Sequence, residues 1–264
     1  MVKGNPIRIL LADDQEEIRL LTSQQFERSG HHVVAVANGQ EALEAFQREP
    51  FAVVFLDEEM PVMNGLQALR AIRDLEHERG RVRVIALTGY NTEQDSKRLL
   101  RAGFDSVLGK PFRLDALEAL FKEPQRIAQV GTRSDAHSAP PRTPFADLLE
   151  RVGGDEKLAR KIISTFLRDT PKRMADLQMA VTQKNGASLA SIAHALRGSV
   201  AIFGAQKACD FSQQLQELGR ANDFGALDRV YEQLKEEIAE LEANLRGYAG
   251  RKSSPSTGVS PKRS

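Results

Sequence analysis

The sequence is poor in the features that would mark a secreted or membrane-spanning chain. Cys209 is the only cysteine among 264 residues, so no internal disulfide and no cysteine-based zinc site can form, which is typical of a reducing cytoplasm. No window approaches the ~20 apolar residues of a membrane helix. The short apolar run from Ile9 to Ala12 is followed at once by acids, so it does not resemble a signal peptide. We therefore expect a cytoplasmic chain without membrane insertion.

An excess of one charge is also absent. The formal net charge is +1, which does not suit a DNA-binding chain, and the sequence suggests no helix-turn-helix domain. A Gly-rich loop of the kind that cradles nucleotide phosphates is missing as well. The sequence thus predicts neither a DNA-binding protein nor an ATP-dependent kinase.

Strand and helix patterns alternate through the first half of the chain. Short apolar runs alternate with segments whose apolar residues recur at helical spacing. The expected strands are Ile7–Ala12, His32–Ala37, Ala52–Leu56, Val82–Leu87 and Ser106–Leu108. The expected helices are Glu16–Arg28, Gln40–Arg48, one that follows Gly65, Thr92–Ala102 and Leu114–Phe121. Five β-α units of this kind favour a doubly wound α/β fold with a five-stranded parallel sheet.

Charged and polar residues stand at the carboxyl ends of these strands. They are Asp13 and Asp14, Asp57, Thr88 and Lys110. Alone, Asp57 would be explained as a turn cap, but the five together converge on the sheet edge where open α/β folds bind ligands. Three carboxylates suit Mg²⁺, and with one metal ion and one ammonium the formal charge is about zero. A phosphoryl group carries a charge of about −1.5 to −2, and it can then be held on Asp57 by the metal ion, the Lys110 ammonium and the Thr88 hydroxyl.

Residues 5–121 resemble a response-regulator receiver domain. The resemblance rests on the paired acids in LLADD, on Asp57 in FLDEEMPVMNG, on the threonine in ALTGY and on Lys-Pro-Phe at 110–112. One position departs from the family pattern. Val107 stands where receivers usually carry a tyrosine or phenylalanine three residues before Lys110, so the sequence lacks the usual aromatic switch residue.

The resemblance implies a chemical role for each residue at the strand ends. Asp57 would accept a phosphoryl group from a phosphohistidine. Thr88 and Lys110 would contact the phosphoryl oxygens. The implied Mg²⁺ ligands are Asp14, Asp57 and the backbone carbonyl of Glu59, with Asp13 close by.

The pattern changes beyond residue 121. Residues 122–143 are rich in proline, glycine and serine and are expected to be a linker. Helical patterns without any strand signal follow at Phe145–Val152, Glu156–Asp169, Pro171–Lys184, Ala187–Phe203, Ala205–Leu218 and Phe224–Tyr248. The last of these carries an apolar stripe formed by Leu227, Val230, Leu234, Ile238, Leu241 and Leu245. Such helices with short connections predict an all-α second domain, an antiparallel four-helix bundle.

One helix of the second half carries an unusual polar face. In SIAHALRGSVAIFGA, His194 lies opposite Ile192 and Leu196, with Arg197 at i+3 and Gly198 at i+4. A glycine inside a helix costs about 0.5 to 1 kcal/mol relative to alanine, and here its missing side chain would leave the imidazole open to a large partner. We expect an exposed His194, with a pKa near ~6.5, that acts as a nucleophile toward phosphorus while Arg197 holds the phosphate.

Residues 144–248 resemble a histidine phosphotransfer (Hpt) domain. AHALRGSVAIFGA is similar to the family signature His-x-Leu-Lys-Gly-Ser followed by small residues and a Gly-Ala turn. Arg197 replaces the usual lysine and keeps its charge. The resemblance implies that His194 is phosphorylated. Residues 249–264 are basic and rich in serine and proline, so we expect a disordered tail, with an ordinary solvated terminus favoured over contact with anionic partners.

Two functional hypotheses follow. In the first, the chain is a two-component phosphorelay protein that carries phosphoryl groups on Asp57 and His194, with a sensor or hybrid histidine kinase and another response-regulator receiver as partners; the receiver can also drain His194 as a phosphate sink. In the second, the chain is a binding module. Phosphorylation of Asp57 then frees or sequesters an Hpt face that blocks a kinase or regulator without chemistry on His194. The direction of transfer, and exchange within one chain, stay open.

Overall fold

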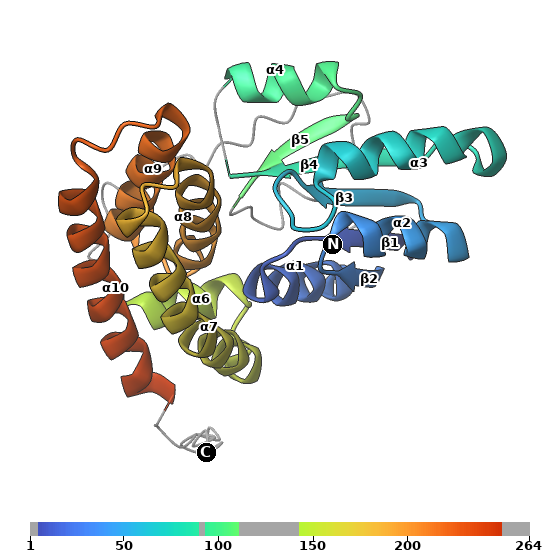
Figure 1. The fold of residues 1–264 in the computed structure, drawn as a ribbon. Coiled ribbons are helices and arrows are strands. Elements are labelled where there is room, and N and C mark those ends of the chain that lie inside the picture. Colours follow the sequence, from blue (N-terminus) through green and yellow to red (C-terminus); the bar gives the residue numbers. More distant parts are fainter. Residues whose placement is uncertain (1–4, 90–92, 111–142, 250–264) are drawn as a thin grey trace, which may run out of the picture.

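The computed structural model describes residues 5–89, 93–110 and 143–249, with a sheet domain followed by a helical bundle (Figure 1). The strands of the first domain are β1 (Arg8–Ala12), β2 (His32–Val36), β3 (Val53–Asp57), β4 (Arg83–Thr88) and β5 (Ser106–Gly109). Its helices are α1 (Glu16–Arg28), α2 (Gly39–Arg48), α3 (Gly65–Arg79) and α4 (Glu93–Arg101). These bounds agree with the sequence-based expectations to within one or two residues where a range was predicted.

All five strands are parallel, in the order β2-β1-β3-β4-β5. Every residue of the central strand β3 is buried, as its unbroken apolar run predicts for a strand covered on both faces. The strand order reverses between β1 and β3, and such a reversal opens a crevice at the carboxyl ends of the two strands. The doubly wound α/β fold is therefore confirmed. Its topology predicts that ligands bind at the edge of the sheet where the carboxyl ends of β1 and β3 lie, which we call the ligand edge.

Each face of the sheet has its own core. On one face, Phe26 of α1 packs against Phe55 of β3 with ring centroids 4.9 Å apart. On the other, Phe46 of α2 and Ile72 of α3 pack against alternate strand residues such as Val54. Because successive strand residues point to opposite faces, this division follows directly from the strand register.

The start of α3 is fixed close to the end of β3. The side chain of Asn64 accepts a hydrogen bond from Gln67 N at 2.9 Å, and the side chain of Gln67 accepts one from Asn64 N at 3.0 Å, which forms a capping box. A Cβ atom at Gly65 would collide with the backbone of Asp57. The glycine thus lets the start of α3 lie against the backbone at the end of β3.

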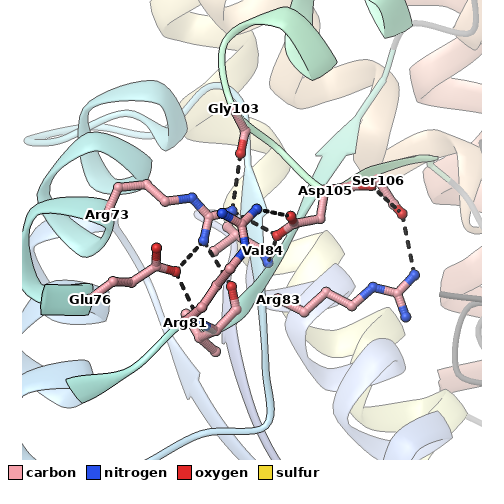
Figure 2. A network of polar contacts seen from close by, with 9 residues as sticks. Arg73, Glu76, Arg81, Arg83, Val84, Gly103, Asp105 and Ser106 are labelled. Carbon is pink, nitrogen blue, oxygen red and sulfur yellow. Dashed lines mark hydrogen bonds and ion pairs between the residues drawn. The ribbon is translucent and has the colours of Figure 1, made fainter. Parts of the chain in front are cut away.

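An arginine network ties α3 to the rest of the sheet domain (Figure 2). Arg73 donates to the carbonyl oxygens of Val82 at 2.8 Å and Gly103 at 3.0 Å, and to the Asp105 carboxylate at 2.7 Å. Burial alone would raise the pKa of Asp105, but hydrogen bonds from Val84 N and from arginines hold it below its usual value. Asp105 is therefore a structural anion and not a free surface acid.

Replacing Arg73 with Ala is expected to lower the free energy of unfolding by about 2 kcal/mol, because several carbonyl and carboxylate acceptors lose a partly buried donor. Urea unfolding of the full chain measures the change. The matched control is Arg70→Ala, which removes an exposed arginine from the same helix and should change stability by less than about 0.5 kcal/mol. Equal effects from the two variants would contradict a stabilising network around Arg73.

The second domain consists of helices throughout its described part. They are α6 (Pro144–Arg151), α7 (Glu156–Thr182), α8 (Gly186–Ala201), α9 (Gln206–Ala221) and α10 (Leu227–Ala249). The four long helices α7 to α10 form the bundle, with short connections as expected. All six residues of the predicted apolar stripe on α10 are buried in its core. Within the described residues, no helix is both long and apolar enough to cross a bilayer.

The helix break expected at Pro171 is wrong, because α7 runs through this residue. An interior proline removes one backbone hydrogen bond and costs about 3 kcal/mol. Residues on both sides of it, including Phe166 and Leu177, are fully buried in one core. Burying a large apolar side chain contributes about 1.5 to 3 kcal/mol, so continuous packing outweighs the local preference.

Several sequence-based expectations fall outside the described residues. They concern the helix at 114–121, most of the linker at 122–143 and the tail beyond Ala249, which is itself the last residue of α10. Thr143, at the end of the expected linker, caps α6 by accepting a hydrogen bond from Ala146 N. The domain limits therefore stay predictions.

Candidate functional site

Three carboxylates meet at the ligand edge of the sheet. Asp57 ends β3, and Asp13 and Asp14 follow β1 across the point where the strand order reverses. One oxygen from each carboxylate lies within 4.8 Å of those of the other two. Asp13 and Asp57 are fully buried. The topology thus brings together the three acids that the sequence placed at strand ends.

Lys110 holds two of these acids through its ammonium group. Its Nζ lies 2.5 Å from Asp13 Oδ2 and 2.6 Å from Asp57 Oδ2. Burial alone would lower the pKa of Lys110, but the two carboxylates reverse this effect and raise it. The backbone N–H of Lys110 donates to the Thr88 carbonyl at 2.7 Å, which fixes the residue beyond the end of β5. A permanent positive charge therefore lies against Asp57.

The cluster keeps an excess of negative charge, since three carboxylates face one ammonium. Burial raises the pKa of Asp57 well above its usual value despite the lowering effect of Lys110. Burial, followed by the neighbouring Asp13 carboxylate, raises the pKa of Asp14 to about 6. Asp57 Oδ1 is buried and receives no hydrogen bond from the residues that the structure describes. Carboxylate oxygens in a cluster with an excess of negative charge fit a hard divalent cation such as Mg²⁺.

Thr88 and Val107 lie on the two strands that follow β3 in the sheet, β4 and β5. The Thr88 hydroxyl, at the end of β4, is buried and donates to Glu58 Oε2 at 3.4 Å. Val107 is buried in β5 within the core of the sheet domain. A small apolar side chain therefore fills the position where an aromatic switch residue would stand.

The second domain brings His194 to the same edge. A cavity of about 390 Å³ is lined by Asp14, Glu58 and Glu59 from the sheet domain and by Ser191, His194 and Ala195 from α8. A Cβ atom placed on Gly89, the residue after Thr88, would lie 2.9 Å from His194 Cε1. One water occupies ~30 Å³ of the liquid, so this cavity has room for a phosphoryl group, a metal ion and water.

His194 is buried, and the expectation of an exposed imidazole is wrong. Only 5% of its surface is accessible, because the sheet domain covers the face of α8 that the sequence pattern left open. Burial, followed by the positive charges of Lys110, Arg197 and Arg220, lowers the pKa of His194 to about 3. The imidazole is therefore neutral at pH 7, as a nucleophile toward phosphorus must be.

Arg197 and Gly198 both contact the sheet domain. A guanidinium nitrogen of Arg197 donates to the backbone carbonyl of Gly89, and another lies 3.5 Å from Gln213 Oε1. A Cβ atom at Gly198 would meet the side chain of Gln15 at 2.5 Å. The space that the glycine leaves is thus filled by a residue from the other domain.

The sequence did not reveal three side chains around His194. Glu59 Oε2 lies 4.0 Å from His194 Nδ1, and Arg220 holds Glu59 through an ion pair of 2.6 Å. Burial raises the pKa of Glu59 despite this arginine. Gln216 is fully buried and raises the pKa of His194, against the larger lowering effects. Gln216 carries a signal that was overlooked: with Ser212 it places polar groups on the buried face of α9.

Comparisons with protein families agree with this division of the chain. Residues 9–122 match the family model of the response regulator receiver domain. Residues 161–244 match the family model of the Hpt domain. Both matches lie within the ranges that the sequence motifs pointed to, apart from one residue at the end of the first.

The chain is also similar to parts of several longer sensor proteins. It is 28% identical over 256 residues to the virulence sensor protein BvgS of Bordetella bronchiseptica, covering 92% of this chain and 21% of BvgS. It is 28% identical over 249 residues to the sensor histidine kinase GacS of Pseudomonas protegens, covering 90% of this chain and 27% of GacS. The chain therefore spans well under half the length of these curated relatives.

Solved structures match part of this chain as well. The Francisella response regulator 1452 receiver domain is 28% identical, covers 44% of this chain and 97% of its own, and gives a TM-score of 0.39. The Vibrio cholerae chemotaxis protein CheY4 is 27% identical, with the same coverages and a TM-score of 0.41. The two family matches, one after the other, show that this chain combines a response regulator receiver domain with an Hpt domain.

Proposed function

We propose that Asp57 and His194 are the two phosphoryl-carrying residues of this chain, and that they exchange a phosphoryl group with each other and with partner proteins. The observation that carries the proposal is the position of His194 at the mouth of the acidic cluster. Its imidazole lines the same cavity as Asp14, whose carboxylate approaches that of Asp57. Lys110 pairs with Asp57 and is close enough to lower the pKa of His194.

The transfer from histidine to aspartate needs two bond changes. The bond between phosphorus and an imidazole nitrogen breaks, and a bond between phosphorus and an Asp57 carboxylate oxygen forms. The departing imidazole is neutral provided that its other ring nitrogen carries a proton. In the reverse step, the neutral imidazole of His194 attacks phosphorus with its free electron pair. The low pKa of His194 keeps that electron pair available near pH 7.

The charged and polar groups around Asp57 favour transfer of a phosphoryl group to its carboxylate. Lys110 places one positive charge at the carboxylate, and the Thr88 hydroxyl stands at the end of the adjacent strand. Such preorganised donors stabilise charge on phosphoryl oxygens without further rearrangement. Asp14, Asp57 and the Glu59 backbone carbonyl, with Asp13 beside them, would hold Mg²⁺, which would supply further positive charge at the phosphoryl oxygens.

The partners follow from the chemistry of the carried group. A sensor or hybrid histidine kinase supplies phosphohistidine, and another response-regulator receiver accepts the group from His194. The chain is similar to parts of sensor proteins, which agrees with a place in such a relay. We place the chain in the cytoplasm, where a kinase can draw phosphate from ATP, and we assign it no DNA partner.

The burial of His194 also favours a second candidate function. An Hpt face that is covered by a receiver can act as a docking surface without chemistry on the histidine. In that case phosphorylation of Asp57 would free or hold the face, and the face would block a kinase or regulator.

Transfer of radiolabel from a phosphorylated histidine kinase of the same cell separates the two functions. We expect label on Asp57 and on His194 in the full chain, with the two sites distinguished because phosphohistidine survives base and acyl phosphate does not. Asp57→Ala should remove both labels, because His194 receives the group through Asp57, whereas His194→Gln should remove only the base-stable label. If Asp57 takes label and His194 never does, from any donor, the docking function replaces the relay.

Magnesium affinity is expected to fall as the pH drops through about 6. Asp14, whose pKa is raised to about 6, is protonated below that pH and must lose its proton to bind the metal. Between pH 7.5 and 5 the affinity should weaken about tenfold, and Asp57 would steepen the fall because its pKa is also raised. Calorimetric Mg²⁺ titrations of the full chain measure this. In Asp14→Asn the affinity should be low throughout; a pH-independent affinity in the unmodified chain would contradict the role of Asp14.

A further inference from the structure

Helix α1 of the receiver is part of the Hpt core. Ile18 and Leu21 are buried in the same apolar cluster as α7, α8 and α10 of the bundle. Figure 1 shows α1 extending from the sheet toward α6 and α7. The space between α1 and the end of α8, lined in part by Ile18, Gly198 and Ile202, is only about 10 Å³, which leaves room for about one water. The two domains are therefore closely packed at α1.

An ion pair between a buried glutamate and a partly buried arginine lies at the edge of this apolar contact. Glu17 of α1 is fully buried, and both its carboxylate oxygens face the guanidinium of Arg173 on α7, the nearer at 3.2 Å. Arg173 also donates to Ser199 Oγ on α8 at 2.6 Å, and Ser199 in turn donates to Gln15 Oε1 at 3.2 Å. This chain of polar contacts links α1 to two helices of the Hpt domain.

Glycines on each domain receive side chains from the other. Gln15 of the receiver lies over Gly198 of α8. Arg28, at the end of α1, donates to the carbonyl oxygens of Val152 and Gly153, and its guanidinium fills the space beside Gly153. In the opposite direction, Arg197 reaches the carbonyl of Gly89. Side chains that enter glycine gaps in both directions indicate surfaces that match each other in shape.

The charges at the interface are complementary. The Hpt domain contributes arginines and the receiver contributes acids, in the pairs Arg168–Glu16 at 2.7 Å, Arg173–Glu17 at 3.2 Å and Arg220–Glu59 at 2.6 Å. Complementary charge fixes the register of two surfaces and disfavours partners with the wrong sign. A receiver without an acid at the position of Glu17 would leave Arg173 without this partner.

We propose that the surface of α8 around His194 is normally occupied by the receiver of the same chain. We further propose that the pair Glu17–Arg173 makes the Hpt domain bind this receiver in preference to other receivers. The inference rests on the proposed function and adds an access rule, which states when another receiver can reach His194. His194 exchanges with Asp57 in the closed chain, and a second receiver reaches His194 only after α1 has left the bundle. Selection by a buried pair works chiefly against wrong partners, because an unpaired buried charge is strongly unfavourable.

Reversal of the two charges, alone and together, tests this access rule. The full chain and its variants Glu17→Arg, Arg173→Glu and the double variant are treated with diethyl pyrocarbonate, and the modification of each histidine is followed by peptide mass spectrometry. His32, exposed on β2, serves as an internal reference that no variant should change. Glu17→Gln is a milder variant that removes the charge without adding an opposing one.

In the unmodified chain, His194 is expected to react at least about tenfold more slowly than His32, because the receiver covers it. Each single reversal should raise the rate at His194 about tenfold, and Glu17→Gln should raise it by less. The double variant should restore most of the protection, as a charge swap does for a directly interacting pair. Equal rates in all chains overturn the closed arrangement. Failure of the double variant to restore protection overturns selection by Glu17–Arg173.

Labelling of the same chains by a phosphorylated kinase distinguishes a failure of the access rule from a failure of the proposed phosphoryl transfer. If His194 takes label in every chain while its protection never changes, the access rule is wrong and the relay stands. If His194 takes label in no chain, including the opened ones, the proposed function is wrong whatever the protection shows.

Discussion

Replacing Lys110 with Ala is expected to slow phosphoryl transfer to Asp57 by about 10² to 10³-fold, which is the usual effect of removing one preorganised donor from a charged transition state. The Lys110 ammonium is buried between Asp13 and Asp57 at 2.5 and 2.6 Å. Without it, two buried carboxylates face each other, and the charge of an incoming phosphoryl group loses the positive group that lies against Asp57. Single-turnover transfer from a phosphorylated kinase at saturating Mg²⁺ measures the effect.

The control for this experiment is Lys97→Ala. Lys97 is an exposed lysine on α4 whose ion pair with Glu93 lies on the surface, and its removal should leave the transfer rate within about twofold. Circular dichroism of both variants verifies that they are folded at the temperature of the assay. A folded Lys110→Ala chain that transfers at the unmodified rate would show that the ammonium has no part in the reaction and serves only to balance the two acids.

The positions of the strand-end residues could be predicted because they depend on local patterns. A parallel sheet brings the carboxyl ends of its strands to one edge, so apolar runs that stop at Asp13 and Asp57 are enough to place both acids together. Helix limits were predictable for the same reason. The helix expected at Glu16–Arg28 has the limits that the structure gives to α1.

The failures concern interactions between distant parts of the chain. Nothing near Pro171 indicates that Phe166 and Leu177 share one core, so local propensity gave two helices where the bundle has one. Likewise, His194 looks exposed as long as α8 is considered alone. Its burial depends on Gly89 and on residues such as Glu59 of the sheet domain, more than 100 residues away, and no periodicity within one domain reports contact with another.

Gln216 illustrates an intermediate case. Its polarity on a buried helix face was visible in the sequence, but the direction of that face toward His194 was not. A buried amide needs a partner, so the pattern could have predicted a polar contact inside the bundle. The identity of the partner required the structure.

Replacing Gly89 with Val is expected to lower exchange between Asp57 and His194 of one chain about 10²-fold, because a side chain at this position would collide with His194 and Arg197. A displacement of about 1 Å between reacting groups can cost this much. Asp57 is labelled with radioactive acetyl phosphate, and base-stable label on His194 is followed in dilute chain, where the rate should not depend on concentration. Gly247→Val, at a glycine of α10 with open space around it, is the control. Labelling of Asp57 itself should stay within about threefold in both variants. If the Gly89→Val chain exchanged as fast as the unmodified chain, the contact of His194 with Gly89 would not be needed for transfer. The arrangement of the two domains in this structure would then not be the one in which the phosphoryl group is transferred.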